Sequence, residues 1–160
     1  MGTALWLAAV LLAGLLALAA SRMWRFRGQG VVTCPETGKP AAVRLNRWRL
    51  LWGRRRLRLA RCSRWPGKRA CGQPCLRQLE HAPEDCLVRN IIEKWYQDKR
   101  CACCGAPLGE IRWTGHKPCL LSPELRLVQW SDLRAESIPG VLATHAPVCW
   151  TCNVAETHTW

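Results

Sequence analysis

The chain has 160 residues, about the size of one ordinary domain, so these residues do not hold several large domains. It carries 24 Lys and Arg against 11 Asp and Glu, a formal net charge of +13. Residues 22–77 hold 16 basic residues and a single acid, whereas residues 78–160 hold 8 basic and 10 acidic residues. The basic character therefore belongs to the N-terminal half of the chain.

Residues 2–21, GTALWLAAVLLAGLLALAAS, contain no charged side chain. About 20 helical residues rise about 30 Å, the thickness of the hydrocarbon core of a bilayer, so we expect a transmembrane anchor over 3–21. A cleaved signal peptide is the alternative, because residues 17–19 have the small-x-small form of a cleavage site. The basic residues follow the apolar run, in a juxtamembrane segment over 22–30, and positive flanks stay cytoplasmic. The prediction is a single-pass protein of the cell inner membrane with a cytoplasmic C-terminal domain.

A second basic segment, RLNRWRLLWGRRRLRLARC at 44–62, interleaves tryptophan and leucine with arginine and contains no acid. Beside an anchor it favours anionic lipid head groups, because these attract basic side chains and tryptophan prefers the membrane interface. Nucleic acid is a weaker alternative, since phosphate contacts are also electrostatic, and a solvated face without a partner is another. The side chains expected to meet an anionic surface are Arg54, Arg55, Arg56 and Arg58.

The first strands are expected directly after the juxtamembrane segment. Residues 31–45, VVTCPETGKPAAVRL, predict a strand, a turn that contains Gly38 and Pro40, and a second strand. Residues 54–62, RRRLRLARC, alternate basic and apolar side chains as a half-exposed strand does. This part of the chain therefore predicts a small sheet.

The main helix is expected over 83–99, where Pro83 is suited to the first turn and apolar residues recur at helical spacing. Short strand-like runs follow it, at 111–113, 120–121 and 127–130. The predicted fold class is α+β: one N-terminal transmembrane helix followed by a small Cys-rich, metal-stapled domain over 31–160, with short strands and one main helix.

Eleven cysteines are the most distinctive feature of the composition. In the cytoplasm thiols stay reduced, so close-spaced cysteines more often hold metal than form disulfides. Two Cys-x-x-Cys pairs, in CACCGAP and CWTCN, can offer four sulfurs to one tetrahedral ion, whereas thiol pairs that only pack as small apolar groups are the alternative. The cofactor predicted is zinc, with an iron–sulfur cluster as the alternative, and the predicted ligands are Cys101, Cys104, Cys149 and Cys152, with Cys103 able to replace either neighbour.

A second and weaker cluster of cysteines precedes the main helix. Two of them are four residues apart in CGQPC, which places them on one helix face if the proline between them starts a helix. No pair here has the Cys-x-x-Cys spacing, and a mixture of free and buried thiols is an equal alternative. The predicted ligands of a second zinc or iron–sulfur site are Cys34, Cys62, Cys71 and Cys75, with Cys86 as a fifth candidate.

Other uses of CWTCN are disfavoured by the neighbouring residues. A c-type haem needs a histidine after the second cysteine, and Asn153 stands there instead. A thioredoxin-like pair normally opens a helix after a strand, and we expect no such arrangement because the runs before this pair are short and Pro147 precedes it. His116 and His145 could complete a Cys₃His site, but a single histidine near a turn is more often a surface or hydrogen-bonding residue.

Five motifs follow the apolar N-terminal segment: CPETG, CSRWP, CLVRNIIEKWY, CCGAPLGEI and THAPVCWTCNVA. In this order, over residues 31–155, they resemble an uncharacterised bacterial group of short, membrane-anchored, cysteine-rich proteins. The resemblance implies an architecture and no activity. Residues 99–155 also resemble a zinc ribbon, although the 44 residues between the two cysteine pairs are more than a compact ribbon has.

The function predicted from the sequence is that of a membrane-anchored, metal-binding interaction protein with an unidentified protein partner. An iron–sulfur or thiol redox protein is the second hypothesis, and a membrane-tethered nucleic-acid binder is the third. No glycine-rich phosphate loop, nucleophile elbow or His-Glu-x-x-His motif is present, so the sequence does not favour an enzyme.

Overall fold

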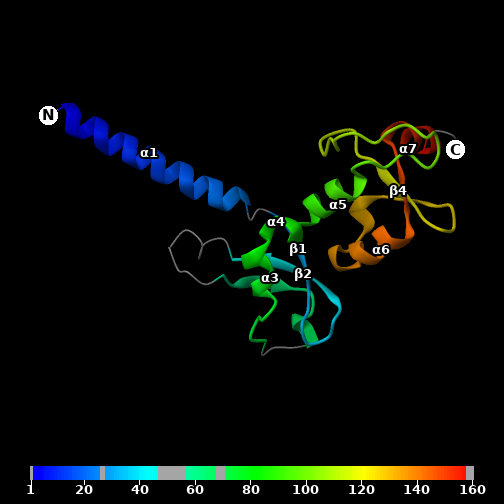
Figure 1. Ribbon diagram of the computed structural model, residues 1–160, viewed down its shortest axis with the longest axis horizontal. Coiled ribbons are helices and arrows are strands. Elements are labelled where there is room, and N and C mark those ends of the chain that lie inside the picture. The colour runs from blue at the N-terminus through cyan, green and yellow to red at the C-terminus, as the bar shows by residue number, and fades with distance from the viewer. Residues whose placement is uncertain (1, 26–27, 47–56, 68–70, 158–160) are drawn as a thin grey trace.

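The computed structural model describes residues 2–25, 28–46, 57–67 and 71–157. They form an α+β structure with two small antiparallel sheets (Figure 1). We call residues 28–86 the N-terminal lobe and residues 97–157 the C-terminal lobe. Each lobe contains one of the sheets, and helix α5 (Val88–Tyr96) joins them.

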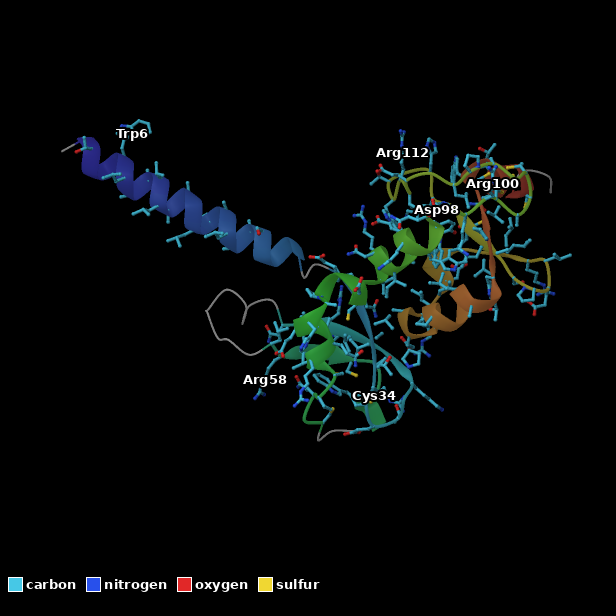
Figure 2. The ribbon with its side chains drawn as sticks, in the orientation of Figure 1. Trp6, Cys34, Arg58, Asp98, Arg100 and Arg112 are labelled. Carbon is cyan, nitrogen blue, oxygen red and sulfur yellow. The ribbon has the colours of Figure 1, made fainter. Side chains whose placement is uncertain are left out.

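Helix α1 (Gly2–Arg25) extends away from both lobes (Figure 1). Its large apolar side chains are exposed wherever the structure describes them, including Trp6 at 74% (Figure 2). Among the described residues, no helix meets the combined criteria of length and apolarity for crossing a membrane. The predicted transmembrane helix over 3–21 is therefore wrong, and the single-pass placement in the inner membrane loses its support. The prediction rested on the length of residues 2–21 and on their lack of charge.

The N-terminal sheet has the order β1-β2-β3, with bounds Gly30–Thr33, Pro40–Leu45 and Leu59–Cys62. Strands β1 and β2 pair antiparallel with Val31 opposite Ala42, as the strand, turn and strand predicted over 31–45 require. Gly38 lies in the turn with a φ of 66°, a left-handed conformation that glycine adopts without strain. The short 3₁₀ helix η1 (Trp65–Gly67) and helix α3 (Leu76–His81) complete this lobe together with helix α4 (Pro83–Cys86).

The single helix predicted over 83–99 is divided in two at Leu87, which has an extended ψ of 126°. Leu87 forms a β-bridge with Gly30, and the Val88 N–H donates to the Gln29 carbonyl at 3.1 Å. The backbone ahead of β1 thus competes for hydrogen bonds that a continuous helix would make internally. Pro83 does open α4, so the predicted start is confirmed and the predicted continuity is wrong.

The C-terminal sheet has the order β5-β4-β6, with bounds Leu127–Val128, Cys119–Leu121 and Ala146–Val148. Leu120 is at its centre, opposite Val128 on one side and Pro147 on the other. Residues 111–113, predicted as a strand, contain no strand. The sequence analysis did not predict the short helices of this lobe. Between β5 and β6 lie η2 (Trp130–Asp132), η3 (Ala135–Ser137) and α6 (Ile138–Thr144), and α7 (Trp150–Thr157) follows β6.

The two sheets share a core on helix α5. Ile92 and Tyr96 of α5 are 2% and 1% exposed, and they pack in one cluster with Val31 and Ala42 of the first sheet and Leu120 of the second. The Tyr96 hydroxyl donates to the Cys119 carbonyl at 2.8 Å, which satisfies its buried polar group. Burial of these side chains fixes the lobes against one helix and leaves a separate group of cysteines in each lobe.

Candidate metal centre

Four cysteines of the C-terminal lobe converge on one point. The sulfurs of Cys101, Cys104, Cys149 and Cys152 all lie within 4.8 Å of one another. The sulfurs of Cys104 and Cys149 are 3.7 Å apart, far longer than a disulfide bond. All four are free thiols. The residues selected from the two Cys-x-x-Cys spacings are thus brought together by the fold.

The first pair lies in a tight turn that ends the segment after α5. The Cys101 N–H donates to the Ala106 carbonyl at 2.8 Å, and the Gly105 N–H donates to the Cys101 carbonyl at 2.9 Å. Gly105 has a φ of 71°, so a residue with a side chain would strain the turn. A further bond, from the Ala102 N–H to the Pro147 carbonyl at 2.8 Å, attaches this turn to strand β6.

The second pair lies where strand β6 passes into helix α7. The Cys149 N–H donates to the Cys101 sulfur at 3.3 Å, and the Cys152 N–H donates to the Cys149 sulfur at 3.4 Å. Cys149 directly precedes α7, and Cys152 lies in its first turn. Both pairs therefore present sulfur atoms surrounded by backbone N–H groups, which stabilise a thiolate.

The electrostatics of the four thiols are unequal. Burial raises the pKa of Cys101, which is 3% exposed, but the backbone N–H groups of Cys149, Cys104 and Cys103 outweigh burial and lower this pKa to about 6. Hydrogen bonding by the neighbouring thiols of Cys149 and Cys104 raises the pKa of Cys152. Four thiolates this close together would repel one another, so full ionisation needs a cation between them. Without metal, the four thiols therefore cannot all be ionised, and a metal ion that binds here displaces the remaining thiol protons.

The donor set and its dimensions are those of a tetrahedral thiolate site. Metal–sulfur bonds of about 2.3 Å place the sulfurs of a tetrahedron about 3.8 Å apart. The 3.7 Å separation of Cys104 and Cys149 already matches this value, and the upper limit of 4.8 Å for the other pairs leaves about 1 Å to close. These four cysteines could hold one metal ion.

Two further cysteines lie close to the centre and outside the converging group. Cys103 is exposed and lies between the two members of the first pair, and it is not one of the four sulfurs that converge. Cys119 is fully buried in β4, and burial raises its pKa to about 12, which keeps the thiol protonated. Its side chain packs with Cys101 and Val148 as a small apolar group.

The residues weighed for a haem or a Cys₃His site have other roles. Asn153 is 5% exposed, and its Oδ1 accepts from Gln129 Nε2 at 2.8 Å, which ties α7 to the residue before η2. The His116 ring packs against Trp150 with centroids 5.4 Å apart, and His145 Nδ1 lies 2.8 Å from the Thr144 hydroxyl. Neither histidine belongs to the group of converging ligand atoms found among the described residues.

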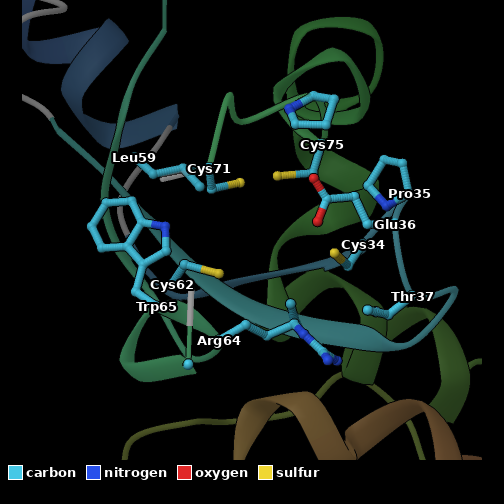
Figure 3. Close-up of a pocket in the computed structure, with 13 residues that line it drawn as sticks. Cys34, Pro35, Glu36, Thr37, Leu59, Cys62, Arg64, Trp65, Cys71 and Cys75 are labelled. Carbon is cyan, nitrogen blue, oxygen red and sulfur yellow. The ribbon is translucent and has the colours of Figure 1, made fainter. Parts of the chain in front are cut away.

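The residues of the second predicted site, Cys34, Cys62, Cys71 and Cys75, all line one cavity of the N-terminal lobe (Figure 3). The fifth candidate, Cys86, is buried at 8% exposure and does not line it. Of the arginines expected to meet an anionic surface, Arg58 is exposed, while Arg54, Arg55 and Arg56 lie outside the described residues. Binding to anionic lipid or nucleic acid stays a prediction.

Sequence reasoning missed two contacts that hold the segments of the C-terminal lobe in this arrangement. The bond from Ala102 to Pro147 and the bond from Gln129 to Asn153 both join segments more than 20 residues apart. No sequence pattern signals the first, because it uses backbone groups only. The second had a weak signal: Asn153 is polar in a segment otherwise rich in apolar residues and cysteine.

No protein-family model matches this chain, and no curated protein or solved structure matches it either. The function must therefore be argued from the two groups of cysteines and their surroundings.

Proposed function

We propose that this protein is a metal-binding interaction protein in which structural zinc fixes the C-terminal lobe. The observation that carries the proposal is the convergence of four free thiols within 4.8 Å. A single tetrahedral ion suits sulfurs about 3.8 Å apart, and zinc is the ion that structural Cys₄ sites usually hold. The four protein sulfurs would fill all four coordination positions of the ion and leave none for a substrate. This is the arrangement of structural rather than catalytic zinc sites.

The C-terminal lobe is small, and for this reason it would need a metal ion to stabilise its fold. Its strands have only two or three residues, and the buried cluster beside the centre consists of Cys101, Cys119 and Val148. So small a core contributes little stability by itself, and small domains often depend on a metal for this reason. The ion would join the turn at Cys101 to helix α7, and the surface folded around it would meet the partner.

Elemental analysis of the full-length protein tests the proposal. After anaerobic purification, we expect a colourless protein with bound zinc, and Cys101→Ser should remove at least one metal equivalent per chain. The matched control is Cys103→Ser, which changes an exposed thiol between two ligands and should keep the zinc content of the wild type. Equal zinc in Cys101→Ser and Cys103→Ser would refute the proposal, and a brown protein with iron and sulfide would replace zinc by a cluster.

A thiol redox protein is the second candidate, because Cys149 and Cys152 do open a helix directly after a strand. The sequence-based argument against this arrangement was wrong, since Pro147 is part of β6 rather than a barrier to it. A Cys-x-x-Cys pair at a helix start is typical of dithiol oxidoreductases. We rank this candidate second because Cys101 and Cys104 adjoin the pair and would have no part in a two-thiol reaction.

Alkylation and mass spectrometry separate the two candidates. The structural-zinc proposal expects four protected thiols in the native protein and no disulfide between Cys149 and Cys152. Chelation of the metal should expose all four to alkylation together. A Cys149–Cys152 disulfide in protein purified anaerobically would favour the redox candidate, because a disulfide removes two ligands from the centre.

A further inference from the structure

The N-terminal lobe contains a cavity of about 690 Å³ with four cysteines in its lining. They come from three segments: Cys34 follows β1, Cys62 ends β3, and Cys71 and Cys75 both lie in the stretch that leads into α3, with Cys75 as its N-cap. Figure 3 shows all four sulfurs directed into the same space, with Cys71 and Cys75 pointing toward each other. Cys71 and Cys75 were expected on one helix face if Pro74 started a helix, and this condition is not met because α3 begins only at Leu76.

Hydrogen-bond donors surround two of these sulfurs. The Gln73 N–H donates to the Cys71 sulfur at 3.4 Å. The Thr37 hydroxyl, followed by the Glu36 N–H, lowers the pKa of Cys34, and Arg64 also favours its thiolate. Donors of this kind stabilise thiolate and are frequent around metal-bound sulfur.

The side-chain amides of Gln73 and Gln78 hold together the segments that carry the four cysteines. Gln73 accepts from the Leu59 N–H at 3.0 Å, which fixes the Cys71 loop to β3. Gln78 accepts from the Thr33 N–H at 3.0 Å and donates to the Thr33 carbonyl at 2.7 Å, which fixes α3 to β1. Gln73 also has a φ of 58°, a conformation that costs energy for a residue with a side chain. The backbone of the lobe is thus held in the shape that aims the sulfurs inward.

The spacing of these sulfurs differs from that in the C-terminal lobe. They are near enough for Cys62, Cys71 and Cys34 to add to burial in raising the pKa of Cys75 to about 11. Among the described residues, however, no three of them fall within 4.8 Å of one another. A single tetrahedral ion would require the four sulfurs to move closer together, whereas an iron–sulfur cluster would fill the wider space, since its thiolates bind different iron atoms.

We propose that Cys34, Cys62, Cys71 and Cys75 form a second four-thiolate centre that binds either one tetrahedral zinc ion or an iron–sulfur cluster. Binding replaces the thiol protons by bonds from each sulfur to the metal and releases those protons to solvent, with no change of oxidation state of the sulfurs. The centre shares no ligand with the C-terminal site and holds α3 and the β1–β2 turn to strand β3. It goes beyond the proposed function, because each lobe would have its own metal.

The experiment is a metal count on the full chain and on single variants, all purified without oxygen. Zinc, iron and acid-labile sulfide are measured per chain for the wild type, Cys71→Ser, Cys34→Ser, Cys101→Ser and Cys86→Ala. We expect two centres in the wild type and the loss of one in Cys71→Ser and in Cys34→Ser. Cys101→Ser should lose the other, and the double variant Cys71→Ser/Cys101→Ser should lose both. Cys86→Ala is the matched control, since Cys86 is buried in the same lobe and does not line the cavity.

The outcomes separate this centre from the proposed function. Zinc lost from Cys71→Ser with the C-terminal metal retained supports a single ion, and loss of iron and sulfide supports a cluster. An unchanged metal content in both Cys71→Ser and Cys34→Ser overturns the second centre, even if Cys101→Ser behaves as expected. A Cys71–Cys75 disulfide in the wild type also overturns it. If a variant fails to fold, titration of the metal-free wild type with Co²⁺ decides, because two tetrahedral thiolate sites give twice the absorbance of one.

Discussion

The two groups of cysteines differ in how the chain brings their sulfurs together. In the C-terminal lobe, two local turns each present a pair of sulfurs, so only one long-range contact is needed to assemble four. In the N-terminal lobe, the four sulfurs come from three segments, around Cys34, Cys62 and Cys71–Cys75, so two long-range contacts must form. The first group lies within 4.8 Å and the second surrounds a cavity of about 690 Å³. Closely spaced ligands thus give a compact site, and dispersed ligands give a wider one whose shape the whole lobe determines.

The largest expected effect comes from removing a ligand of the compact site. Cys149→Ser should abolish metal binding at the C-terminal centre and unfold the C-terminal lobe, because structural zinc contributes about 10 kcal/mol or more of apparent binding energy to small domains. Amide exchange should accelerate in β4, β5 and β6 and stay slow in β1 and β2. The double variant Cys149→Ser/Cys101→Ser should be no less stable than the single one, since the metal is already lost. Additive losses would show that the two cysteines act separately.

Acidification should release the C-terminal metal, because protons compete with it for the four sulfurs. The pKa of Cys101 is lowered from 9.0 to about 6 in the metal-free fold. Its ionisation therefore favours the folded state fully above pH 9, and this contribution is lost as the pH falls through about 6. Below about pH 6 the Cys101 thiol is protonated as well, so the metal must displace one more proton. We therefore expect the logarithm of the zinc affinity to fall more steeply with falling pH below about pH 6 than above it. A chromogenic zinc indicator measures this release, and a constant slope from pH 8 to pH 5, within about a tenth, would contradict the expectation.

A matched pair of core variants measures how much of each lobe depends on packing. Leu120→Ala removes a side chain with 0% exposure at the centre of the second sheet, and Leu79→Ala removes one with 2% exposure in α3. Each should destabilise the metal-loaded protein by about 2–5 kcal/mol in urea unfolding, the range for large-to-small changes in protein cores. A loss under about 1 kcal/mol for Leu120→Ala alone would mean that the metal, rather than packing, sustains the C-terminal lobe.

The smallest expected effect concerns the hydrogen bond between helix α5 and the second sheet. Tyr96→Phe removes the hydroxyl that donates to the Cys119 carbonyl at 2.8 Å and leaves the ring in place. We expect a loss of about 1 kcal/mol in thermal or urea unfolding, with unchanged metal content, because one buried neutral hydrogen bond contributes this amount. Metal loss in this variant would instead show that Tyr96 positions β4 for the centre.

The elements that the sequence predicted well depend on local chemistry. The strand, turn and strand at 31–45 follow from β-branched residues on either side of Gly38, and the start of α4 follows from Pro83. The errors arose where distant backbone groups intervene. Leu87 leaves the helix because it pairs with Gly30, and the helix after β6 was missed because nothing local distinguishes a turn from a helix start at Cys149.

The sequence by itself determined which residues could act as ligands, because a Cys-x-x-Cys spacing brings two sulfurs to one side of a turn whatever surrounds it. It selected both the compact group and the four cysteines that line the cavity. Only the tertiary structure decided that Cys101 and Cys149, 48 residues apart, meet through a hydrogen bond from N–H to sulfur, and that Cys86 is excluded from the cavity. Those outcomes depend on burial of Tyr96 and Leu120 in a shared core, and the free energy of such burial comes from contacts between residues far apart in the chain.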